Sequence, residues 1–283
     1  MMLSVIILSY RNPALLRLCL KSLVAALPKD FNYEIVVVDN ATRSETRNVV
    51  CDEFKEAFRS IKFVPIKKNS GYTRGINEGI SAAQGEYFLA LNQDIVVLKG
   101  AVEKLLLYFK DHLEIGLIGP ELLNFNGTHQ DSYFRFYTPV TIFYRRIGYL
   151  PFARRILDPF LLRETDPSKV QKPDWVSGAA FMTSREAIKK VGLLDEKLFH
   201  YFSDVDWARR FWENGYQVVY YPEAKFYHYL GRSSKGKLLI FDIFFNQTTR
   251  WHIKDFWRYF RKYGFLTRHS ARNISQPSHA TTY

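Results

Sequence analysis

The sequence predicts an α/β fold with a mainly parallel central sheet and helices on both faces. Over its first hundred or so residues, short β-rich runs alternate with helical segments four times. Such alternation is typical of parallel strands joined by right-handed crossovers. The runs are continuously apolar, as expected of strands that are buried on both faces. At 283 residues, 47% of them hydrophobic, the chain is long enough to bury a large core.

Each expected strand is followed by a helical segment. The strands are residues 3–8, 33–38, 61–66 and 86–91. Leucines recur at helical spacing over residues 15–27, a charged helix is expected over residues 44–59, and a helix of small residues ends at residue 83. A further helix and strand are expected in residues 99–119. The order of elements therefore returns the chain repeatedly to the same edge of the sheet.

Polar side chains follow the carboxyl ends of these strands. Asn92-Gln93-Asp94 interrupts an apolar stretch, while Ser9, Asp39 and residues 69–71 follow the other strands. In an open α/β sheet, ligands bind in the crevice beyond these ends, so we expect the four loops to meet at one rim. Taken singly, Asp39 and Asp94 also fit ordinary turns. Their convergence favours a binding site, with Asp94 placed to reach a substrate or a metal ion.

A glycine-rich segment follows the third strand. Gly71, Gly75 and Gly79 recur every four residues, which places them on one face of a helix. One interpretation is close packing of this helix on the sheet. The other is a helix start that lets a nucleotide approach, with Arg74 and Asn77 as polar contacts. The segment matches neither a Walker loop nor the Gly-x-Gly-x-x-Gly fingerprint of dinucleotide-binding folds.

The regular alternation ends at residue 121. Residues 121–173 are rich in Tyr, Phe, Arg and Pro, and we interpret them as an irregular insert that forms a substrate-side lid or loop. Further on, Asp204 and Asp206 stand among aromatic residues just before a helix. They fit a helix cap. They also fit a sugar pocket, in which a desolvated carboxylate is a stronger base.

The cysteines and the apolar segments of the sequence indicate the cellular compartment of the protein. The two cysteines, Cys19 and Cys51, show no spacing of a metal site or a disulfide framework, which favours a reducing compartment. The first residues do not have the pattern of a signal peptide, and no apolar run is long enough to span a bilayer. We therefore expect a cytoplasmic protein whose membrane contact, if it has one, is peripheral at the inner face of the plasma membrane.

Positive charge is concentrated near the end of the chain. Residues 232–272 hold ten Lys or Arg and two Asp, which is +8 of the net charge of +12. Residues 236–270 are expected to form a basic amphipathic helical tail, and residues 271–283 to be disordered. The aromatic face of the tail can lie on anionic lipid or pack on the rest of the protein, and both remain open. Because the basic and aromatic residues are not interleaved on a sheet face, we expect no nucleic-acid partner.

Seven sequence pieces, in their order and spacing, resemble the family 2 glycosyltransferases of the GT-A fold, particularly the bacterial rhamnosyltransferase-like members. The pieces are Val5-Ile-Ile-Leu-Ser-Tyr, Val36-Val-Val-Asp-Asn, Asn69-Ser-Gly-Tyr-Thr-Arg-Gly-Ile-Asn, Leu91-Asn-Gln-Asp, Trp175-Val-Ser-Gly-Ala, Phe202-Ser-Asp-Val-Asp and His228-Tyr-Leu-Gly-Arg-Ser. The resemblance implies a Rossmann-like GT-A catalytic domain over residues 1–235. Within it, residues 1–98 would be the nucleotide-binding half and residues 174–235 the acceptor half.

The resemblance also implies roles for single residues. Those expected to hold the nucleotide are Ser9, Tyr10, Asp39, Asn69, Gly71, Arg74, Asn77 and Asn92. Asp39 would face the base or the ribose, and Asp204 would be the catalytic general base. Asp94 and His228 would bind Mg²⁺ or Mn²⁺ on the donor diphosphate. Contacts to the donor or acceptor sugar would come from Trp175, Gly178, Ala179 and Asp206.

The activity that the resemblance implies is inverting transfer of a sugar, with L-rhamnose as the first expectation. The donor would be a dTDP- or UDP-linked sugar. The acceptor would be a growing bacterial surface polysaccharide such as O-antigen, or a lipid-linked glycan. Two positions depart from the family pattern: Asn92 replaces the first Asp of the Asp-x-Asp motif, and Ser203 replaces the usual Glu before the base. An inactive homologue that still binds sugar nucleotides is therefore the alternative.

Overall fold

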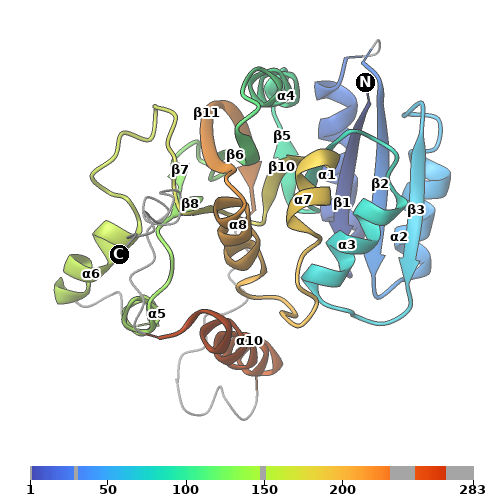
Figure 1. Ribbon diagram of the computed structural model, residues 1–283. Helices are drawn as coiled ribbons and strands as arrows, with labels where there is room; N and C mark the ends of the chain where they lie inside the picture. Colours follow the sequence, from blue (N-terminus) through green and yellow to red (C-terminus); the bar gives the residue numbers. More distant parts are fainter. Residues whose placement is uncertain (1, 29–30, 147–150, 230–245, 266–283) are drawn as a thin grey trace.

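A mixed sheet forms the centre of the molecule (Figure 1). The structure is a computed structural model that describes residues 2–28, 31–146, 151–229 and 246–265. Within these residues the strands of the sheet are β1 (Leu3–Ser9), β2 (Tyr33–Asn40), β3 (Ile61–Ile66), β4 (Tyr87–Asn92), β5 (Ile95–Val97), β6 (Ile115–Leu123), β7 (His129–Gln130), β10 (Ala180–Ser184) and β11 (Gln217–His228). Their order is β3-β2-β1-β4-β10-β6-β11-β5, and β7 pairs with β6. Strands β8 (Tyr133–Phe134) and β9 (Trp175–Val176) form a separate pair.

The first four strands run parallel, as predicted. Strand β1 pairs with β2 on one side and with β4 on the other, and β2 pairs with β3. In this register Ser9 lies opposite Asp39, and Leu8 lies opposite Asn92. The expected rim of strand ends therefore exists. The other half of the sheet is mixed, because β10 is antiparallel to β4 and β6, whereas β11 is parallel to β6 and antiparallel to β5.

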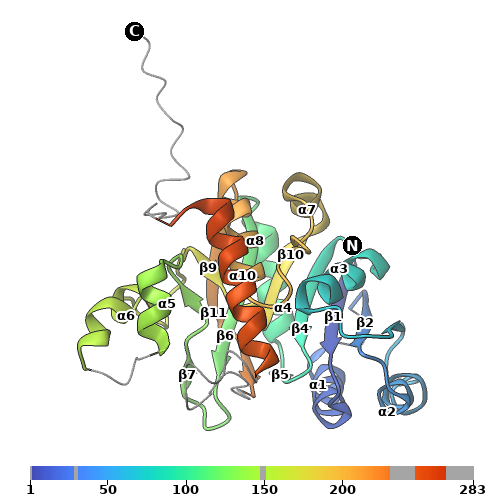
Figure 2. The ribbon, with the colours of Figure 1, turned by 90° about the horizontal axis from the view of Figure 1, so that it is seen from below.

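Helices cover both faces of the sheet (Figure 2). They are α1 (Pro13–Ala26), α2 (Ser44–Asn48), α3 (Tyr72–Ala82), α4 (Ala101–Asp111), α5 (Pro139–Arg146), α6 (Arg154–Phe160), α7 (Arg185–Val191), α8 (Ser203–Glu213) and α10 (Gln247–Tyr263). Alternate residues of β1 point to opposite faces: Val5 and Ile7 pack with α1, and Ile6 and Leu8 pack with α3. Helices α1, α2 and α4 lie on one side, and α3, α7 and α8 lie on the other.

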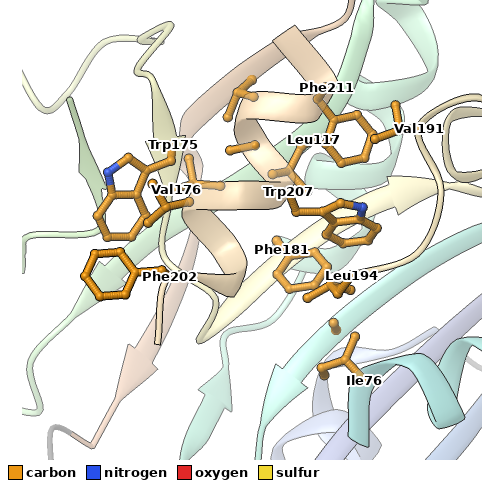
Figure 3. Packing of buried hydrophobic residues seen from close by; sticks show 14 of the residues in the cluster. Ile76, Leu117, Trp175, Val176, Phe181, Val191, Leu194, Phe202, Trp207 and Phe211 are labelled. Atoms are coloured by element: carbon orange, nitrogen blue, oxygen red, sulfur yellow. The ribbon is translucent and has the colours of Figure 1, made fainter. Parts of the chain in front are cut away.

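Helix α8 is held on the sheet by large aromatic side chains. Figure 3 shows Trp207 and Phe211 of this helix beside Phe181 and Leu117 of the sheet. Both are almost fully buried, and the ring centroids of Trp207 and Phe181 are 5.5 Å apart in an edge-on contact. Truncating a buried side chain of this size costs about 3–5 kcal/mol. The start of α8, where Asp204 stands, is therefore attached to a rigid support.

The glycine face of α3 packs on β1. A Cβ atom on Gly75 would lie 2.4 Å from Leu8 Cδ1, and one on Gly79 would lie 2.3 Å from Ile6 Cγ2. Only glycine permits so close an approach of helix and strand. For these two positions the packing interpretation is confirmed.

Two segments differ from the expected elements. The insert, residues 121–173, is not irregular: it contains β7, β8, α5 and α6, held by stacked rings such as Phe134 and Phe160 at 5.5 Å. The helix expected over residues 44–59 is shorter, because α2 ends at Asn48 and the chain continues as a π-helical turn, Val49–Glu53. In the insert, aromatic burial supplied the order that the missing hydrophobic periodicity did not reveal.

The aromatic face of α10 packs on the rest of the protein. Tyr259 and Phe260 are each 2% exposed, whereas Trp257 is 58% exposed. Of the two interpretations of the tail, packing is confirmed for this helix. Residues 236–245 and 266–270 of the tail, and the expected disordered residues 271–283, lie outside the described residues. In the part of the chain that is described, no helix is both long enough and apolar enough to cross a membrane.

Candidate active site

Strands β1, β2 and β4 bring three polar groups to the rim. The Ser9 hydroxyl donates to Gln93 Oε1 at 2.9 Å, and Gln93 Nε2 donates to the Tyr10 carbonyl at 2.8 Å. Asp39 is fully buried, and its Oδ2 accepts the backbone N–H of Arg43 at 3.2 Å. Gln93 was not predicted as a site residue. Its amide fixes the loop after β1, which makes it a positioning residue for Ser9 and Tyr10.

The second oxygen of Asp39 is buried inside the protein, where burial raises the pKa of this carboxyl and the Thr46 and Ser9 side chains lower it by less. Asp39 Oδ1 has no hydrogen-bond partner among the described residues. Leaving a buried acceptor unsatisfied costs about 1–3 kcal/mol. A ligand that donates a hydrogen bond to Oδ1 would recover this free energy.

Asp94 and His228 face each other across the edge of the sheet. Asp94 lies in the turn between β4 and β5, and β11, which ends at His228, pairs with β5. His228 Nε2 is 3.7 Å from Asp94 Oδ1. On the other side of the ring, Nδ1 is 2.6 Å from Gln130 Oε1. With Gln130 accepting, the proton of the neutral imidazole lies on Nδ1 and the lone pair of Nε2 points toward Asp94.

This pair fits a divalent cation. Asp94 Oδ1 is buried without a hydrogen-bond partner among the described residues, and burial raises the pKa of Asp94 and lowers that of His228. Carboxylate oxygens are ordinary ligands of both Mg²⁺ and Mn²⁺, whereas an imidazole nitrogen favours a transition-metal ion such as Mn²⁺ over Mg²⁺. Gln130 binds the far side of the imidazole and fixes its orientation. Among the described residues no third His, Cys, Asp or Glu joins them. Water and substrate oxygens would have to complete the coordination.

Asp204 stands at the start of α8, where three segments meet. Its Oδ2 accepts the Gly178 N–H and its Oδ1 accepts the Val205 N–H, both at 3.0 Å. The Tyr72 hydroxyl of α3 donates to the Gly178 carbonyl at 2.6 Å. Burial raises the pKa of Asp204 against the opposing effect of the two N–H groups. Asp204 as a whole residue is half-buried, and desolvation of its carboxylate raises its basicity.

One short segment connects the two acids. The Ala179 carbonyl accepts the N–H of Asn92, two residues before Asp94, at 2.9 Å. Gly178, the preceding residue, donates its N–H to Asp204. The sheet register explains this arrangement, because Ala180 of β10 lies opposite Leu91 of β4. The Asp204 side chain and the backbone of Asn92, two residues before Asp94, are therefore bound to adjacent residues of one segment.

Left-handed backbone gathers in the loops around the site. Four described non-glycine residues have a positive φ: Arg11, Ala41 and Phe202, at 51°, 91° and 63°, and Leu162 in the insert, at 52°. The first three follow β1 and β2 and precede α8. Such conformations cost about 1–3 kcal/mol each and persist only where the surroundings impose them. The loops that carry Ser9, Asp39 and Asp204 are thus held in shapes that free peptides avoid.

Several other predicted nucleotide contacts lie in the same region. Asn69 Oδ1 accepts the Gly71 N–H at 2.9 Å, which shapes the loop before α3. Arg74 is exposed and lies 3.6 Å from Glu78, and Tyr10 is 39% exposed. Asn92 is half-buried at the end of β4.

Gly71 and Ala179 contact protein rather than open space. A Cβ atom on Gly71 would lie 2.3 Å from the Phe199 carbonyl oxygen, so this glycine allows close packing of two loops. Ala179 is 5% exposed. Of the small residues expected to admit a ligand, Gly178 is the one bonded to the candidate base.

Three side chains that were predicted to contact a ligand, those of Asn77, Trp175 and Asp206, are instead bonded to other parts of the protein. Asn77 is bonded to the backbone N–H and carbonyl of Leu194, at 3.1 and 3.0 Å, and ties α3 to the loop before α8. Trp175 is 5% exposed, and its indole N–H donates to the Arg135 carbonyl at 2.8 Å.

Asp206 corrects the expectation of a sugar contact most clearly. It is fully buried. Its carboxylate accepts hydrogen bonds from the side chains of Arg210 at 2.9 Å, Lys262 at 2.6 Å and Tyr263 at 2.7 Å. An α-helix turns about 100° per residue, so two residues two positions apart point to nearly opposite sides. With Asp204 directed to Gly178, Asp206 faces α10.

Comparison with sequence models of protein families adds a second line of argument. The model described as Glycosyl transferase family 2 matches residues 4–192. A model described as Glycosyl transferase family group 2 matches residues 162–278. Together the two matches include Ser9, Asp39, Asp94, Asp204 and His228.

Curated proteins similar to the chain carry related descriptions. The dTDP-rhamnosyl transferase RfbF of Shigella flexneri is 26% identical over 236 residues, which are 81% of this chain and 69% of RfbF. The low-salt glycan biosynthesis hexosyltransferase Agl10 of Haloferax volcanii is 27% identical over 184 residues, which are 62% of this chain and 52% of Agl10. The chain thus matches about half the length of Agl10.

Solved structures share the fold. The mannosyltransferase PcManGT from Pyrobaculum calidifontis, solved with GDP-Man and Mn²⁺, aligns with a TM-score of 0.60 at 16% identity, over 92% of this chain and 64% of PcManGT. GalNAc-T7, solved with UDP, GalNAc and Mn²⁺, aligns with a TM-score of 0.58 at 18% identity, over 80% of this chain and 43% of GalNAc-T7. These likenesses confirm the predicted GT-A fold. By its match to the family model over residues 4–192, the chain belongs to glycosyl transferase family 2.

Proposed function

We propose that this protein transfers a sugar from a nucleotide diphosphate donor to a glycan hydroxyl with inversion of the anomeric centre. The observation that carries the proposal is the position of Asp204. Burial raises the pKa of its carboxyl, and the carboxylate accepts the N–H of Gly178. The next residue, Ala179, accepts the N–H of Asn92, which is two residues before Asp94. A base and a candidate diphosphate site thus share one stretch of backbone.

The proposed step needs one base and a stabilised leaving group. Asp204 takes the proton from the acceptor hydroxyl as that oxygen forms a bond to the anomeric carbon. The bond from this carbon to the phosphate oxygen breaks, and its electron pair leaves with the nucleotide diphosphate. Attack from the face opposite the leaving group inverts the centre, as in inverting glycosidases. Asp94 and His228 would hold a Mg²⁺ or Mn²⁺ ion, which neutralises negative charge on the departing diphosphate.

We assign the nucleotide to the rim formed by β1 and β2. The buried Asp39 carboxylate would accept a hydrogen bond from the base or the ribose through Oδ1. Ser9 and Tyr10, held by Gln93, border the same rim. Asn69, Arg74 and Asn92 are the remaining polar groups that we expect to contact the nucleotide.

For the donor we propose dTDP-rhamnose first, with UDP-linked sugars next, on the basis of the likeness to RfbF. For the acceptor we propose a bacterial surface polysaccharide such as O-antigen, or a lipid-linked glycan. A lipid-linked acceptor would bring the protein to the cytoplasmic face of the membrane. The exposed Trp257 and Arg261 of α10 would face anionic lipid there.

A thermal-shift panel tests donor recognition. The native protein is heated with UDP-, dTDP- and GDP-sugars, each with and without Mn²⁺. A ligand that binds the native state raises the melting temperature, and the rise grows with the logarithm of the ratio of ligand concentration to Kd. The proposal expects the largest shift with one class of nucleotide sugar in the presence of Mn²⁺. If no nucleotide sugar shifts the transition, donor binding and the proposed function fail.

Transfer assays with the best donor then separate the enzyme from an inactive homologue. The neutral Asn92 and Ser203 at family acid positions keep that second reading open. Release of free nucleotide diphosphate, measured for the wild type and Asp204→Asn, distinguishes them. Turnover that requires Asp204 supports the enzyme. A donor that binds and never turns over with any glycan acceptor supports the inactive homologue.

A further inference from the structure

We propose that α10 is part of the catalytic apparatus and that Asp255 positions the segment carrying the base. This inference rests on the proposed role of Asp204. We call residues 199–204, which lead from Phe199 to Asp204, the base loop. In Figure 1, α10 lies beyond the edge toward which β1 and β2 point, beside the start of α8.

Asp255 binds the base loop through its backbone. Its Oδ1 accepts the N–H of Phe199 at 3.1 Å, and its Oδ2 accepts the N–H groups of His200 and Tyr201 at 2.9 and 3.0 Å. The carboxylate is fully buried. Successive N–H groups that converge on one anion form a nest, an arrangement that fixes the backbone conformation of the segment supplying them. A helix that merely covered the core would not need a buried charge at this position.

The next residue of the base loop is held by rings of the same helix. Phe202 has a left-handed backbone, with φ of 63°. Its ring stacks with Tyr259 at 5.3 Å and with His252 at 5.6 Å, each with an interplanar angle of 25°. The turn at Phe202 sets the direction in which α8 starts, and hence the direction of Asp204. Without these contacts a bulky side chain in this conformation would relax.

Helix α10 also grips the chain beyond the base. Lys262 Nζ and the Tyr263 hydroxyl bind Asp206 Oδ1 at 2.6 and 2.7 Å. Asp206 follows Asp204 by two residues, so the same helix fixes the backbone on both sides of the base. Because Asp206 is fully buried, water has little access to its carboxylate, and the two hydrogen bonds are stronger than they would be at the surface.

The base loop in turn touches the nucleotide-binding half. The Phe199 carbonyl lies against Gly71, where a Cβ atom would approach to 2.3 Å. The Thr73 hydroxyl donates to the neighbouring Leu198 carbonyl. A displaced base loop would therefore disturb the relation between Asp204 and the bound donor, and a misplacement of 1 Å can lower a rate about a hundredfold.

The test is Asp255→Asn, compared with the wild type and with the matched control Lys254→Gln. The asparagine keeps the size of the side chain but removes its charge and replaces one of the two accepting oxygens with an NH₂ group, so at least one of the three backbone N–H groups loses its acceptor. We expect kcat to fall by about a hundredfold while donor affinity is retained within about twofold. Lys254 is the exposed neighbour of Asp255 on α10. Its substitution also removes one charge, and it is expected to leave both values unchanged.

The pH dependence of kcat adds a readout that a purely structural role would not move. A base loop that has loosened would expose Asp204 to water and lower its raised pKa, so the acid limb of the profile would shift to lower pH. The other ionisable groups near Asp204, which are Arg145, Tyr137 and Tyr72, are untouched by the substitution. If Asp255→Asn does not fold, Tyr263→Phe tests the grip on Asp206, with an expected fall in kcat of about threefold to tenfold.

The inference is overturned if folded Asp255→Asn keeps the wild-type kcat and the wild-type acid limb. It is also overturned if kcat falls equally in Lys254→Gln. Where only Tyr263→Phe folds, an unchanged kcat in that variant overturns it. Failure of the proposed function looks different. In that case Asp204→Asn itself keeps wild-type turnover, or the wild type shows none.

Discussion

The two candidate acids of this protein are fixed in different ways. Asp94 lies in a tight turn between two strands, and its partner His228 ends a strand that pairs with the second of them. Asp204 depends on contacts from distant parts of the chain, because Gly178 binds its carboxylate and α10 binds the loop before it. The difference teaches that sheet register, with the side chains of Gln93 and Gln130, positions the proposed donor site, whereas the proposed base is positioned by contacts from a separate helix.

The largest expected effect concerns the base. General-base catalysis contributes about 10²–10⁴-fold to a rate, so Asp204→Asn should lower kcat by about a thousandfold. Binding of the donor, followed by calorimetry, should remain, because the Asn oxygen can still accept the Gly178 N–H. Asp158→Asn, on the exposed surface of α6, is the matched control. Loss of donor binding in Asp204→Asn would contradict the assignment of Asp204 to the attacking hydroxyl rather than to donor binding.

The next effect concerns the support behind the proposed cation site. Gln130→Leu removes the acceptor that orients His228. Loss of such a partner lowers metal affinity about 10–100-fold. The Mn²⁺ concentration giving half-maximal activity should rise accordingly, while kcat at saturating Mn²⁺ should stay near the wild-type value. Gln217→Leu, on the opposite end of β11, serves as the control. Equal Mn²⁺ dependence in all three proteins would remove His228 from the site.

A smaller effect distinguishes binding from stability at Asp39. Burial raises the pKa of this carboxyl in the folded protein, so its stabilising contribution is complete below the ordinary Asp pKa and is lost as the pH rises through the raised value. Asp39→Asn should therefore raise the melting temperature at pH 7 by about 2–4 °C and should weaken nucleotide binding. The gain should disappear near pH 4, which scanning calorimetry at both pH values would measure. A lower melting temperature of Asp39→Asn at pH 7 would contradict the free-energy cost assigned to burying the charged Asp39 carboxylate.

The smallest effect is electrostatic. The positive charge of Arg145 lowers the pKa of Asp204, although less than burial raises it. Arg145→Gln should therefore shift the acid limb of kcat upward by a few tenths of a pH unit. The sign follows because Asp204 must be ionised to accept a proton, and a higher pKa means loss of activity at a higher pH. A shift to lower pH would show that Arg145 acts on another group.

The donor side of this comparison was readable from the sequence. Carboxyl ends of parallel strands meet at one edge, so the run of apolar segments ending at Ser9, Asp39 and Asp94 was enough to place the three residues together. The glycine repeat also predicted its own packing on β1. These features depend on local periodicity and on the order of the strands.

The base side was readable only in part. The family resemblance named Asp204 as the base and Asp206 as a sugar contact, but the packing of α8 turns Asp204 toward Gly178 and Asp206 toward α10. Asp255 carried no signal, since it is one acid in a basic segment and its three partners are backbone groups. Gln93 and Gln130 were missed for a similar reason: an amide reveals its partner only when two distant strands are paired.

Strand β11 ties the late part of the chain to the early part, because it pairs with both β5 and β6. This pairing places His228, at the end of β11, opposite Asp94, which precedes β5. A pair of residues more than a hundred positions apart therefore meets only when β11 is in register. A slip of β11 by one residue would turn His228 to the other face of the sheet and separate it from Asp94.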